Sequence, residues 1–370
     1  MRALVTGGAG FIGSHLVDLL VERGHRVRIL DDLLPQAHPT GQPRHLNADA
    51  ELIVGDVRDQ GAVDRALENV DTVFHLAGMV GNGQSMFDLV RYTDVNVRGT
   101  ATLLEALLAR RASIRRLVTA SSMVVYGDGA YACPSCGPCR AVRPRERLER
   151  REWEPICPAC GAVAAAVATP ETQPLAPNST YGITKRDQEE LSLVVGRAHG
   201  LPAIALRYLN TYGSRQALSN PYTGVAAIMA MRLRLGKRPI LFEDGRQLRD
   251  PIHVRDVAEA TLAAAEAPPS ALYAAYNVGA GHPMTIGDMA RALARAMGVA
   301  IEPEVSGEFR EGDIRHCFAD TSLTERVLGF RAKVRFEEGA GELADWVAHE
   351  APIDNTERAN DELRRSGLLR

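Results

Sequence analysis

The chain has 370 residues, of which 45% are hydrophobic and 24% charged, and its formal net charge is −3. This is an ordinary globular balance, the length suits about two domains, and the nearly neutral charge excludes a strong general attraction to nucleic acid or anionic membranes. No apolar run is as long as a membrane span, and the first predicted strand begins at Arg2. We therefore expect a cytoplasmic protein without a signal or transit peptide, without membrane contact and without nucleic acid as a partner.

The first predicted strand, Arg2 to Thr6, leads into a glycine-rich turn and then an amphipathic helix through Arg23. Glycines at 7, 10 and 13 permit a tight turn, close approach of the backbone to a pyrophosphate, and close packing of helix on strand. Because the pattern lies between a strand and a helix, it predicts a dinucleotide-binding turn. The residues expected against the cofactor are Gly7, Gly10, Phe11, Ile12 and Gly13.

The next strands supply further candidates for cofactor binding. Arg26 to Leu30 ends at Asp31 and Asp32, where a carboxylate can bond the adenosine ribose and would repel a 2′-phosphate, which favours NAD over NADP. A later strand ends before Asp56 and Val57, suitably placed for the adenine amino group. Another ends at Leu76-Ala77-Gly78, where small residues let the backbone pass close to the cofactor. With Leu117 to Ser122 as a fifth strand and helical patterns such as Gly99 to Ala109 between strands, the alternation predicts a parallel sheet.

Five of the six cysteines fall between residues 133 and 160. They include two copies of one C-P-x-C-G turn, which together provide four thiolates for a tetrahedral structural zinc site. Disulfides or redox-active thiols are the alternative, which a reducing compartment disfavours. Cys139 is expected to be the spare thiol, or to replace Cys136 if the loop shifts. The predicted ligands are Cys133, Cys136, Cys157 and Cys160.

The cysteines belong to an insert, residues 129–170, that lies between the Ser122 strand and Tyr181 in sequence. This position predicts a zinc-ribbon-like module near the mouth of the active site, either as a flap that shapes or covers the site or as part of a subunit interface. Its Arg- and Glu-rich stretch, 140–154, favours a solvated hairpin of neutralising charges over a nucleic-acid contact. Residues 162–168 are predicted to form a strand of the ribbon.

Tyr181 and Lys185 set a phenol and an ammonium one helical turn apart. Residues i and i+4 share a helix face, so Lys185 can hold positive charge near the Tyr181 hydroxyl and favour its ionised form. A tyrosinate beside a nicotinamide ring is a base for alcohol oxidation. The same spacing occurs by chance on solvated helices, so the interpretation depends on the accompanying motifs.

Those motifs occur in a fixed order. They are Asn96 within D-V-N-V-R-G-T, the Ser-rich strand end leading to Tyr126-Gly127, the run Leu206 to Gly213, and the run Arg249 to Val257. From Met1 to about Trp346, interrupted once, the chain resembles the extended short-chain dehydrogenases/reductases of the nucleotide-sugar epimerase and dehydratase group. The resemblance implies a Rossmann-type doubly wound α/β sheet, a smaller α/β substrate-binding domain, tightly bound NAD, and a homodimer paired through helices such as 99–109 and 184–197.

The resemblance also implies roles for individual residues. Tyr181 would be the general base, Lys185 would hold the nicotinamide ribose and lower the tyrosine pKa, and Ser122 would bond the reacting sugar oxygen. Asn96 would join Tyr181 and Lys185 at the cofactor. For a nucleotide-diphosphate sugar, the expected contacts are Asn210, Arg249 and Arg310 to the pyrophosphate and Asp313 to the nucleoside ribose. Each arginine taken singly could equally be a surface charge, and Pro251 stands where relatives commonly have Phe or Tyr.

Met123 and Val124 reduce the number of reactions that the resemblance allows. Relatives that eliminate water carry an acid and a base at these positions, and relatives that decarboxylate a uronic acid keep a Glu at the second. Neither Met nor Val can move a proton, so what remains is reversible oxidation at C4 with hydride returned to the other face. The apolar pair would also suit the methyl group of a 6-deoxysugar.

The stretch Arg215 to Val225 is similar to dTDP-L-rhamnose 4-epimerases. We therefore predict an NAD-dependent nucleotide-sugar 4-epimerase that acts on a dTDP-6-deoxysugar. The alternatives are another nucleotide-sugar oxidoreductase or decarboxylase of the same family, and a non-catalytic protein that senses NAD.

The predicted domains are discontinuous in sequence. Residues 1–128, 171–215 and 248–280 would form the NAD-binding domain, and residues 216–247 and 281–350 the nucleotide-sugar-binding domain. Residues 351–370 are polar and mixed in charge, which predicts a loose helical tail without an assigned function.

Overall fold

A seven-stranded sheet with the order β14-β9-β5-β4-β1-β2-β3 forms the centre of the computed structural model, which describes residues 1–218, 220–222, 224–351 and 353–370. Every pair of neighbouring strands in this sheet is parallel. The order reverses between β1 and β4, as in doubly wound sheets, which confirms the predicted fold class. The strands are β1 (Arg2–Thr6), β2 (Arg26–Asp31), β3 (Glu51–Val54), β4 (Thr72–His75), β5 (Arg116–Ser122), β9 (Ala203–Tyr208) and β14 (Ala275–Val278).

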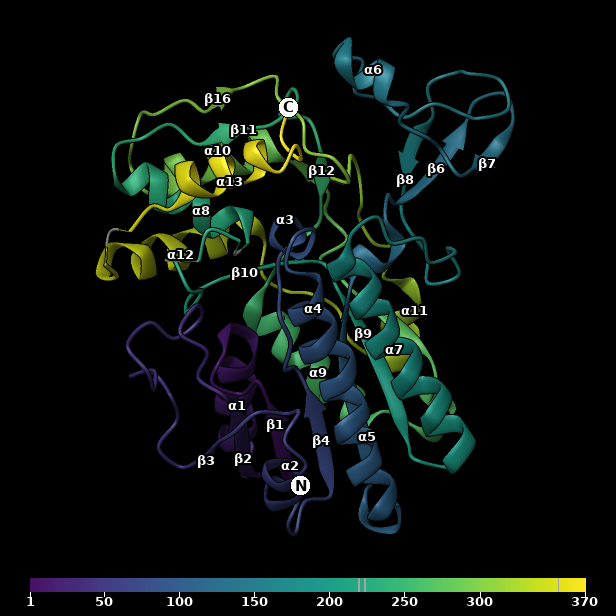
Figure 1. The fold of residues 1–370 in the computed structure, drawn as a ribbon, viewed down its shortest axis with the longest axis vertical. Helices are drawn as coiled ribbons and strands as arrows, with labels where there is room; N and C mark the ends of the chain where they lie inside the picture. The colour runs from purple at the N-terminus through teal and green to yellow at the C-terminus, as the bar shows by residue number, and fades with distance from the viewer. Residues whose placement is uncertain (219, 223, 352) are drawn as a thin grey trace.

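Helices cover both faces of the sheet (Figure 1). Successive strand residues point to opposite faces, so Val5 packs in one core and Leu4 in the other. The strands are therefore nearly continuous apolar runs, as buried parallel strands require. On the Val5 side lie α1 (Phe11–Glu22) and α9 (Val254–Glu266), and on the Leu4 side lie α2 (Gln60–Ala66), α5 (Gly99–Ala109) and α7 (Thr180–His199).

A smaller unit packs beyond the carboxyl ends of the strands (Figure 1). Its core is a separate cluster that includes Met229, Leu293 and Leu343, one from each of three helices. The helices of this unit are α8 (Val225–Arg234), α10 (Ile286–Ala296), α12 (Phe336–His349) and α13 (Thr356–Arg365). Its strands pair as β10 (Asn210–Tyr212) with β13 (Pro251–His253), β11 (Ile240–Leu241) with β16 (Glu304–Val305), and β12 (Leu248–Arg249) with β15 (Met284–Thr285).

The cysteine insert projects from the rest of the fold, at the upper right in Figure 1. It contains an antiparallel sheet in the order β7-β6-β8, and the predicted strand within 162–168 is observed as β8. Its elements are β6 (Ala130–Cys133), β7 (Gly137–Cys139), α6 (Arg145–Glu149) and β8 (Ala165–Val167).

Several short helices complete the fold. They are α3 (Asn82–Ser85), α4 (Leu89–Tyr92), a π-helix (Thr93–Arg98), α11 (Ser322–Leu328), and 3₁₀ turns at Arg111–Ser113, Met123–Tyr126 and Pro269–Ala271. Among the described residues, no helix combines the length and the apolar character that crossing a membrane would require.

Candidate active site

A cleft of about 1170 Å³ lies between the carboxyl ends of the central strands and the smaller unit. Ligands of doubly wound folds bind at this edge of the sheet, near the point where the strand order reverses. The cleft brings together almost all of the predicted cofactor, catalytic and substrate residues. Those that line it are Gly7, Gly10, Phe11, Ile12, Gly13, Asp31, Asp32, Asp56, Val57, Leu76, Ala77, Gly78, Ser122, Tyr181, Lys185, Asn210, Arg249, Arg310 and Asp313.

The glycine turn after β1 is packed too closely for side chains. Gly7 has φ +69°, and a Cβ there would lie 2.8 Å from the backbone nitrogen of Ala77. A Cβ on Gly13 would lie 2.2 Å from the Gly7 carbonyl oxygen. Helix α1 starts with no side-chain cap, so its first N–H groups stay available for an anion. This cradle fits the pyrophosphate of a dinucleotide.

Carboxylates stand at the ends of β2 and β3. Asp31 accepts hydrogen bonds from the N–H groups of Ala9 and Leu33, each at 3.0 Å, which fixes its carboxylate beside the glycine turn. The pKa of Asp32 is raised by burial and by the neighbouring Asp31. Both residues are therefore positioned for the ribose contact that the sequence predicts.

Asp56 has a partner that sequence reasoning missed. Both of its oxygens accept hydrogen bonds from Arg58 Nε, at 2.9 and 3.0 Å, and Arg58 also pairs with Asp94. The hydrogen bonds from Arg58 lower the pKa of Asp56. Arg58 itself lines the cleft, so the adenine end of the site presents an ion pair rather than a free carboxylate.

Asn96 is the one predicted cofactor residue that does not line the cleft. It is fully buried in the π-helix, where its Nδ2 donates to the Met79 carbonyl at 3.1 Å and to Thr184 Oγ1 at 2.9 Å. Its Oδ1 accepts the Met79 N–H at 2.7 Å. In this structure the amide of Asn96 ties the loop after β4 to helix α7, and its contact with the cofactor stays a prediction.

The predicted catalytic residues meet where β5 ends and α7 begins. Ser179 caps α7 by accepting the Gly182 N–H at 3.1 Å, which starts the helix in the register that aims Tyr181 at the cleft. Ser122, at the end of β5, lies near enough to the Tyr181 phenol that its hydroxyl lowers the pKa of Tyr181. Lys185 lies one turn further along α7, and its Nζ donates to the Ala120 carbonyl and, at 2.8 Å, to Gln188 Oε1.

Burial controls the pKa values of this pair. It raises the pKa of Tyr181 to about 12, against the opposing effect of the Ser122 hydrogen bond. It also lowers the pKa of Lys185 to about 7, against the opposing charge of Glu189. The Lys185 ammonium is directed at Ala120 and Gln188 rather than at the phenol. Its effect on the tyrosine pKa stays a prediction. In this arrangement the Ser122 hydroxyl is the group that favours the tyrosinate.

Met123 and Val124 follow Ser122 in a 3₁₀ turn and line the cleft as buried apolar side chains. A thioether and an isopropyl group cannot exchange protons. The wall next to Ser122 and Tyr181 therefore offers no acid or base at the two positions where elimination would need them.

The predicted substrate-binding residues differ in how many hydrogen bonds they already make within the protein. The Oδ1 of Asn210 and the Nε of Arg310 are buried without a hydrogen-bond partner. Arg310 lies over the Phe242 ring, 3.9 Å from its centroid. Arg249 instead donates to three carbonyls, those of Leu248, Ile314 and Arg315, and its Nη2 is 3.7 Å from Asp313 Oδ1. Asn210 and Arg310 thus have unused hydrogen-bonding atoms: the Arg310 guanidinium fits a pyrophosphate, whereas the free Oδ1 of Asn210 can accept from a hydroxyl or N–H and only its Nδ2 could donate to a phosphate oxygen.

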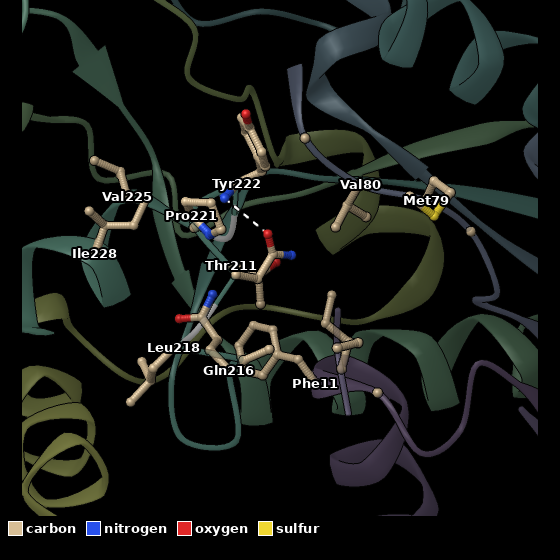
Figure 2. Close-up of a pocket in the computed structure, with 18 of the residues that line it drawn as sticks. Phe11, Met79, Val80, Thr211, Gln216, Leu218, Pro221, Tyr222, Val225 and Ile228 are labelled. Atoms are coloured by element: carbon tan, nitrogen blue, oxygen red, sulfur yellow. Dashed lines mark hydrogen bonds between the residues drawn. The ribbon is translucent and has the colours of Figure 1, made fainter. Parts of the chain in front are cut away.

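Apolar side chains line the part of the cleft next to α8. Figure 2 shows Leu218, Val225 and Ile228 on one wall and Phe11 of the glycine turn nearby. In the same view the Tyr222 N–H donates to Asn220 Oδ1 at 3.0 Å. Within the stretch Arg215 to Val225, positions 219 and 223 lie outside the described residues.

The four predicted metal ligands converge in the insert. The sulfur atoms of Cys133, Cys136, Cys157 and Cys160 all lie within 4.8 Å of one another. Tetrahedral zinc with Zn–S bonds of about 2.3 Å needs sulfur atoms about 3.8 Å apart, so the cluster has nearly the right size. Each turn closes on a glycine with positive φ, +74° at Gly137 and +73° at Gly161. The donor set fits a structural zinc ion.

The insert does not cover the sugar site. None of residues 129–170, all of which the structure describes, lines the cleft, so the prediction that the insert covers the site is wrong, whereas a role in shaping the site or extending a subunit interface stays a prediction. The insert instead packs against residues 309–316, behind the cleft wall. Trp153 contacts Phe309, with ring centroids 6.3 Å apart, and Arg143 donates to the Asp313 carbonyl at 3.2 Å. The chain length between Ser122 and Tyr181 places no limit on how far a module can extend, which is why sequence position misled.

Ion pairs around the buried Arg315 join the insert to that wall. Arg315 has no exposed side-chain surface and pairs with Glu154 of the insert at 2.5 Å, with Glu243 at 2.8 Å and with Asp244 at 2.6 Å. The other oxygen of Glu154 lies 2.9 Å from His316 Nε2. The predicted solvated hairpin is therefore only partly present. Pairs such as Arg145 with Glu149 are exposed, but Glu154 is part of the fold.

Known proteins match the chain along almost its whole length. The model of the NAD dependent epimerase/dehydratase family matches residues 3–146 and 157–279. A dTDP-L-rhamnose 4-epimerase of Burkholderia thailandensis is 37% identical over 358 residues, which cover 96% of this chain and 97% of that protein. A putative UDP-glucose 4-epimerase of Methanocaldococcus jannaschii is 30% identical, with 93% and 97% covered. Among solved structures, the Thermus thermophilus UDP-glucose 4-epimerase in complex with NAD is 31% identical, covers 95% of this chain and 100% of its own, and superposes with a TM-score of 0.73. The chain belongs to the NAD dependent epimerase/dehydratase family.

Proposed function

We propose that this protein is an NAD-dependent nucleotide-sugar 4-epimerase that acts on a thymidine-diphosphate 6-deoxysugar. The observation that carries the proposal is the pairing of Ser122 and Tyr181 beside two side chains, Met123 and Val124, that cannot transfer protons. The names of the similar proteins, 4-epimerases of dTDP-L-rhamnose and of UDP-glucose, support the same reaction. The apolar pair and the match to the rhamnose enzyme favour a sugar with a methyl group at C6.

In the proposed mechanism the protein moves one proton and holds the diphosphate. The Ser122 hydroxyl first donates to the Tyr181 oxygen and so favours the tyrosinate; after the Tyr181 oxygen has taken the proton of the C4 hydroxyl, the Ser122 O–H turns to donate to the C4 oxygen as negative charge develops there. NAD bound at the glycine turn supplies a nicotinamide ring that can take a hydride from C4 and give it back to the opposite face. Asn210, Arg249 and Arg310 hold the pyrophosphate, and Asp313 accepts from the nucleoside ribose, while the sugar turns over. Tyr181 then returns the proton, so nothing is consumed.

A panel of nucleotide sugars, followed by proton NMR, tests the proposal. With dTDP-L-rhamnose we expect inversion at C4 without added nicotinamide, and retention of the C4 hydrogen in heavy water because the hydride never exchanges with solvent. The purified protein should carry bound NAD. Turnover that requires stoichiometric NADH or NADPH would instead identify a net oxidoreductase.

The pH dependence tests the role of Ser122. Tyr181 acts as a base only when ionised, and its pKa lies above neutrality, so kcat should rise with pH between about 6 and 9. Ser122→Ala removes the hydroxyl that lowers the pKa of Tyr181, so the rise of kcat with pH in this variant should shift to higher pH. Ser122→Thr keeps a hydroxyl and should restore the wild-type profile. Superimposable profiles for wild type and Ser122→Ala would remove Ser122 from the proposed mechanism.

We further propose that Cys133, Cys136, Cys157 and Cys160 bind one structural zinc ion. We also propose that the chain divides into three parts: the NAD-binding segments, the insert 129–170, and the nucleotide-sugar-binding segments. The convergence of four thiolates in two matching turns favours zinc, and four cysteines leave no coordination position for substrate.

A homodimer is also proposed. Apolar side chains on α4 and α7 are unusually exposed: Leu89 by 52%, Val90 by 83%, Ile183 by 42% and Val194 by 65%. We infer that a second copy of the chain covers them, since large apolar side chains left exposed on neighbouring helices favour an interface. Sedimentation equilibrium is expected to give twice the chain mass, and Val90→Asp with Val194→Asp to give the single mass.

A further inference from the structure

The helix α13 forms a wall of the cleft. Thr356, Ala359, Asn360 and Leu363 all line it, at the i, i+3, i+4 and i+7 positions of one helix face. The opposite face carries the charges that made this segment resemble a loose tail in the sequence. Helix α13 is thus amphipathic, and the less polar of its two faces lines the cleft.

Contacts at both ends hold α13 in place. Before the helix, Asp354 accepts hydrogen bonds from Arg232 and Lys237, both at 3.1 Å. Within it, Glu362 accepts the Tyr222 hydroxyl at 2.8 Å. Leu363 also lies near Gly83 of α3, where a Cβ would come within 3.2 Å of it. This places α13 between the α8 end of the cleft and α3.

The residues after α13 attach directly to the strand-like segment that carries Arg310. The Phe309 N–H donates to the Arg370 carbonyl at 2.7 Å, and the Glu311 N–H donates to the Leu368 carbonyl at 2.8 Å. Arg364 also pairs with Glu308 at 3.0 Å. The wall formed by α13 therefore has a fixed position relative to the Arg310 guanidinium.

Asn360 stands out on this wall. It is 97% buried, since its exposed fraction is 3%, and it lines the cleft. Among the residues that the structure describes, its side-chain amide has no hydrogen-bond partner, and because the side chain lines the cleft the amide opens onto the ligand space instead of being sealed inside the protein. Its neighbours on the same face, Ala359 and Leu363, are apolar, so the amide is an isolated polar group facing the ligand space.

We propose that Asn360 is a specificity-determining residue that hydrogen-bonds a neutral polar group of the bound nucleotide sugar, either a sugar hydroxyl or a carbonyl of the base. This rests on the proposed function. A neutral partner fits because an amide both donates and accepts, while Arg310 and Arg249 serve the charged diphosphate. A buried amide also rejects ligands that leave it unpaired, which is how a single group of this kind selects among similar substrates.

Isothermal titration with dTDP and with dTDP-L-rhamnose tests the assignment. Loss of one neutral hydrogen bond predicts that Asn360→Ala binds dTDP-L-rhamnose about threefold to tenfold more weakly than wild type. If dTDP weakens by the same factor the partner is on the nucleotide, and if it does not the partner is on the sugar; both results support the proposal. Asn360→Asp has the same shape and keeps the assignment testable if the alanine variant fails to fold. It should weaken the binding of both ligands because its charge opposes the diphosphate.

Asp361→Ala is the matched control, because it removes an exposed side chain at the next position of α13. It should bind both ligands as wild type does. Bound NAD, measured by absorbance after denaturation, should be equal in all variants. Affinities of Asn360→Ala and Asn360→Asp within twofold of wild type would overturn the assignment. A wild-type protein that binds and epimerises no nucleotide sugar would instead overturn the proposed function.

Discussion

Replacing Tyr181 by Phe is expected to lower kcat by on the order of 10³-fold, because general base catalysis typically contributes between about 10² and 10⁴. The substitution removes the oxygen that takes the C4 proton and keeps the ring that packs edge-on against Tyr92, with centroids 6.3 Å apart. KM for the nucleotide sugar and the amount of bound NAD should stay close to wild type. Initial rates of C4 inversion by proton NMR provide the measurement.

Tyr92→Phe is the control for this substitution. Tyr92 is fully buried, its hydroxyl donates to the Val80 carbonyl at 2.8 Å, and it does not line the cleft. Its loss should cost some stability and leave kcat within a few-fold of wild type. If Tyr181→Phe kept more than a tenth of the wild-type kcat, another group would have to be the base.

Removing the metal from the insert is expected to raise KM strongly and to change kcat little. Structural zinc supplies about 10 to 16 kcal/mol of apparent binding energy in small zinc modules, more than such a module can replace by packing. Without it, Glu154 and Arg143 would no longer hold Arg315 and the segment that carries Arg310 and Asp313. We expect KM to rise at least tenfold after chelation, with faster amide exchange in residues 129–170 and 309–316 and with bound NAD unchanged.

Two cysteine variants separate the metal from a general effect of thiol loss. Cys136 is one of the four converging sulfurs, whereas Cys139, three residues later, is not. We expect wild type to carry the proposed zinc and Cys136→Ser to lack it, as measured by mass spectrometry of the metal, and Cys136→Ser to reproduce the effect of chelation. Cys139→Ser should keep both zinc and KM. A Cys136→Ser protein with full zinc content and wild-type exchange rates would contradict the proposal.

The nucleotide-binding half could be predicted from sequence because its signals are local. The strand before Gly7, the glycine spacing, Asp31 at the next strand end and the i, i+4 relation of Tyr181 to Lys185 each lie within one element or one turn. The pKa of Tyr181 could not be predicted in the same way. The helical spacing places two residues on one face, but the direction of the Lys185 ammonium depends on Ala120 and Gln188, which it meets through tertiary packing.

The substrate-binding part of the cleft was harder to predict from the sequence, because it also depends on tertiary packing. Asn96 has the sequence context of a ligand-binding residue, and its use as a tie between Met79 and Thr184 follows from how α7 packs. Helix α13 is polar on average, so its inward face is visible only once Asn360 and Leu363 are placed on the cleft. Contacts between segments hundreds of residues apart leave no periodic pattern in the sequence.

The way the insert joins the fold bears on how such a module is gained or lost in evolution. Its two ends lie side by side: β6 and β8 pair with each other, and the Ala130 N–H donates to Thr169 Oγ1 at 3.0 Å. A short loop between these ends could therefore replace the whole module without moving β5 or α7. Such an excision would expose Arg315 and leave Glu243 and Asp244 to balance it, so lineages that lack the module should also differ at these three positions. The insert and the three residues Arg315, Glu243 and Asp244 are therefore expected to be gained or lost together.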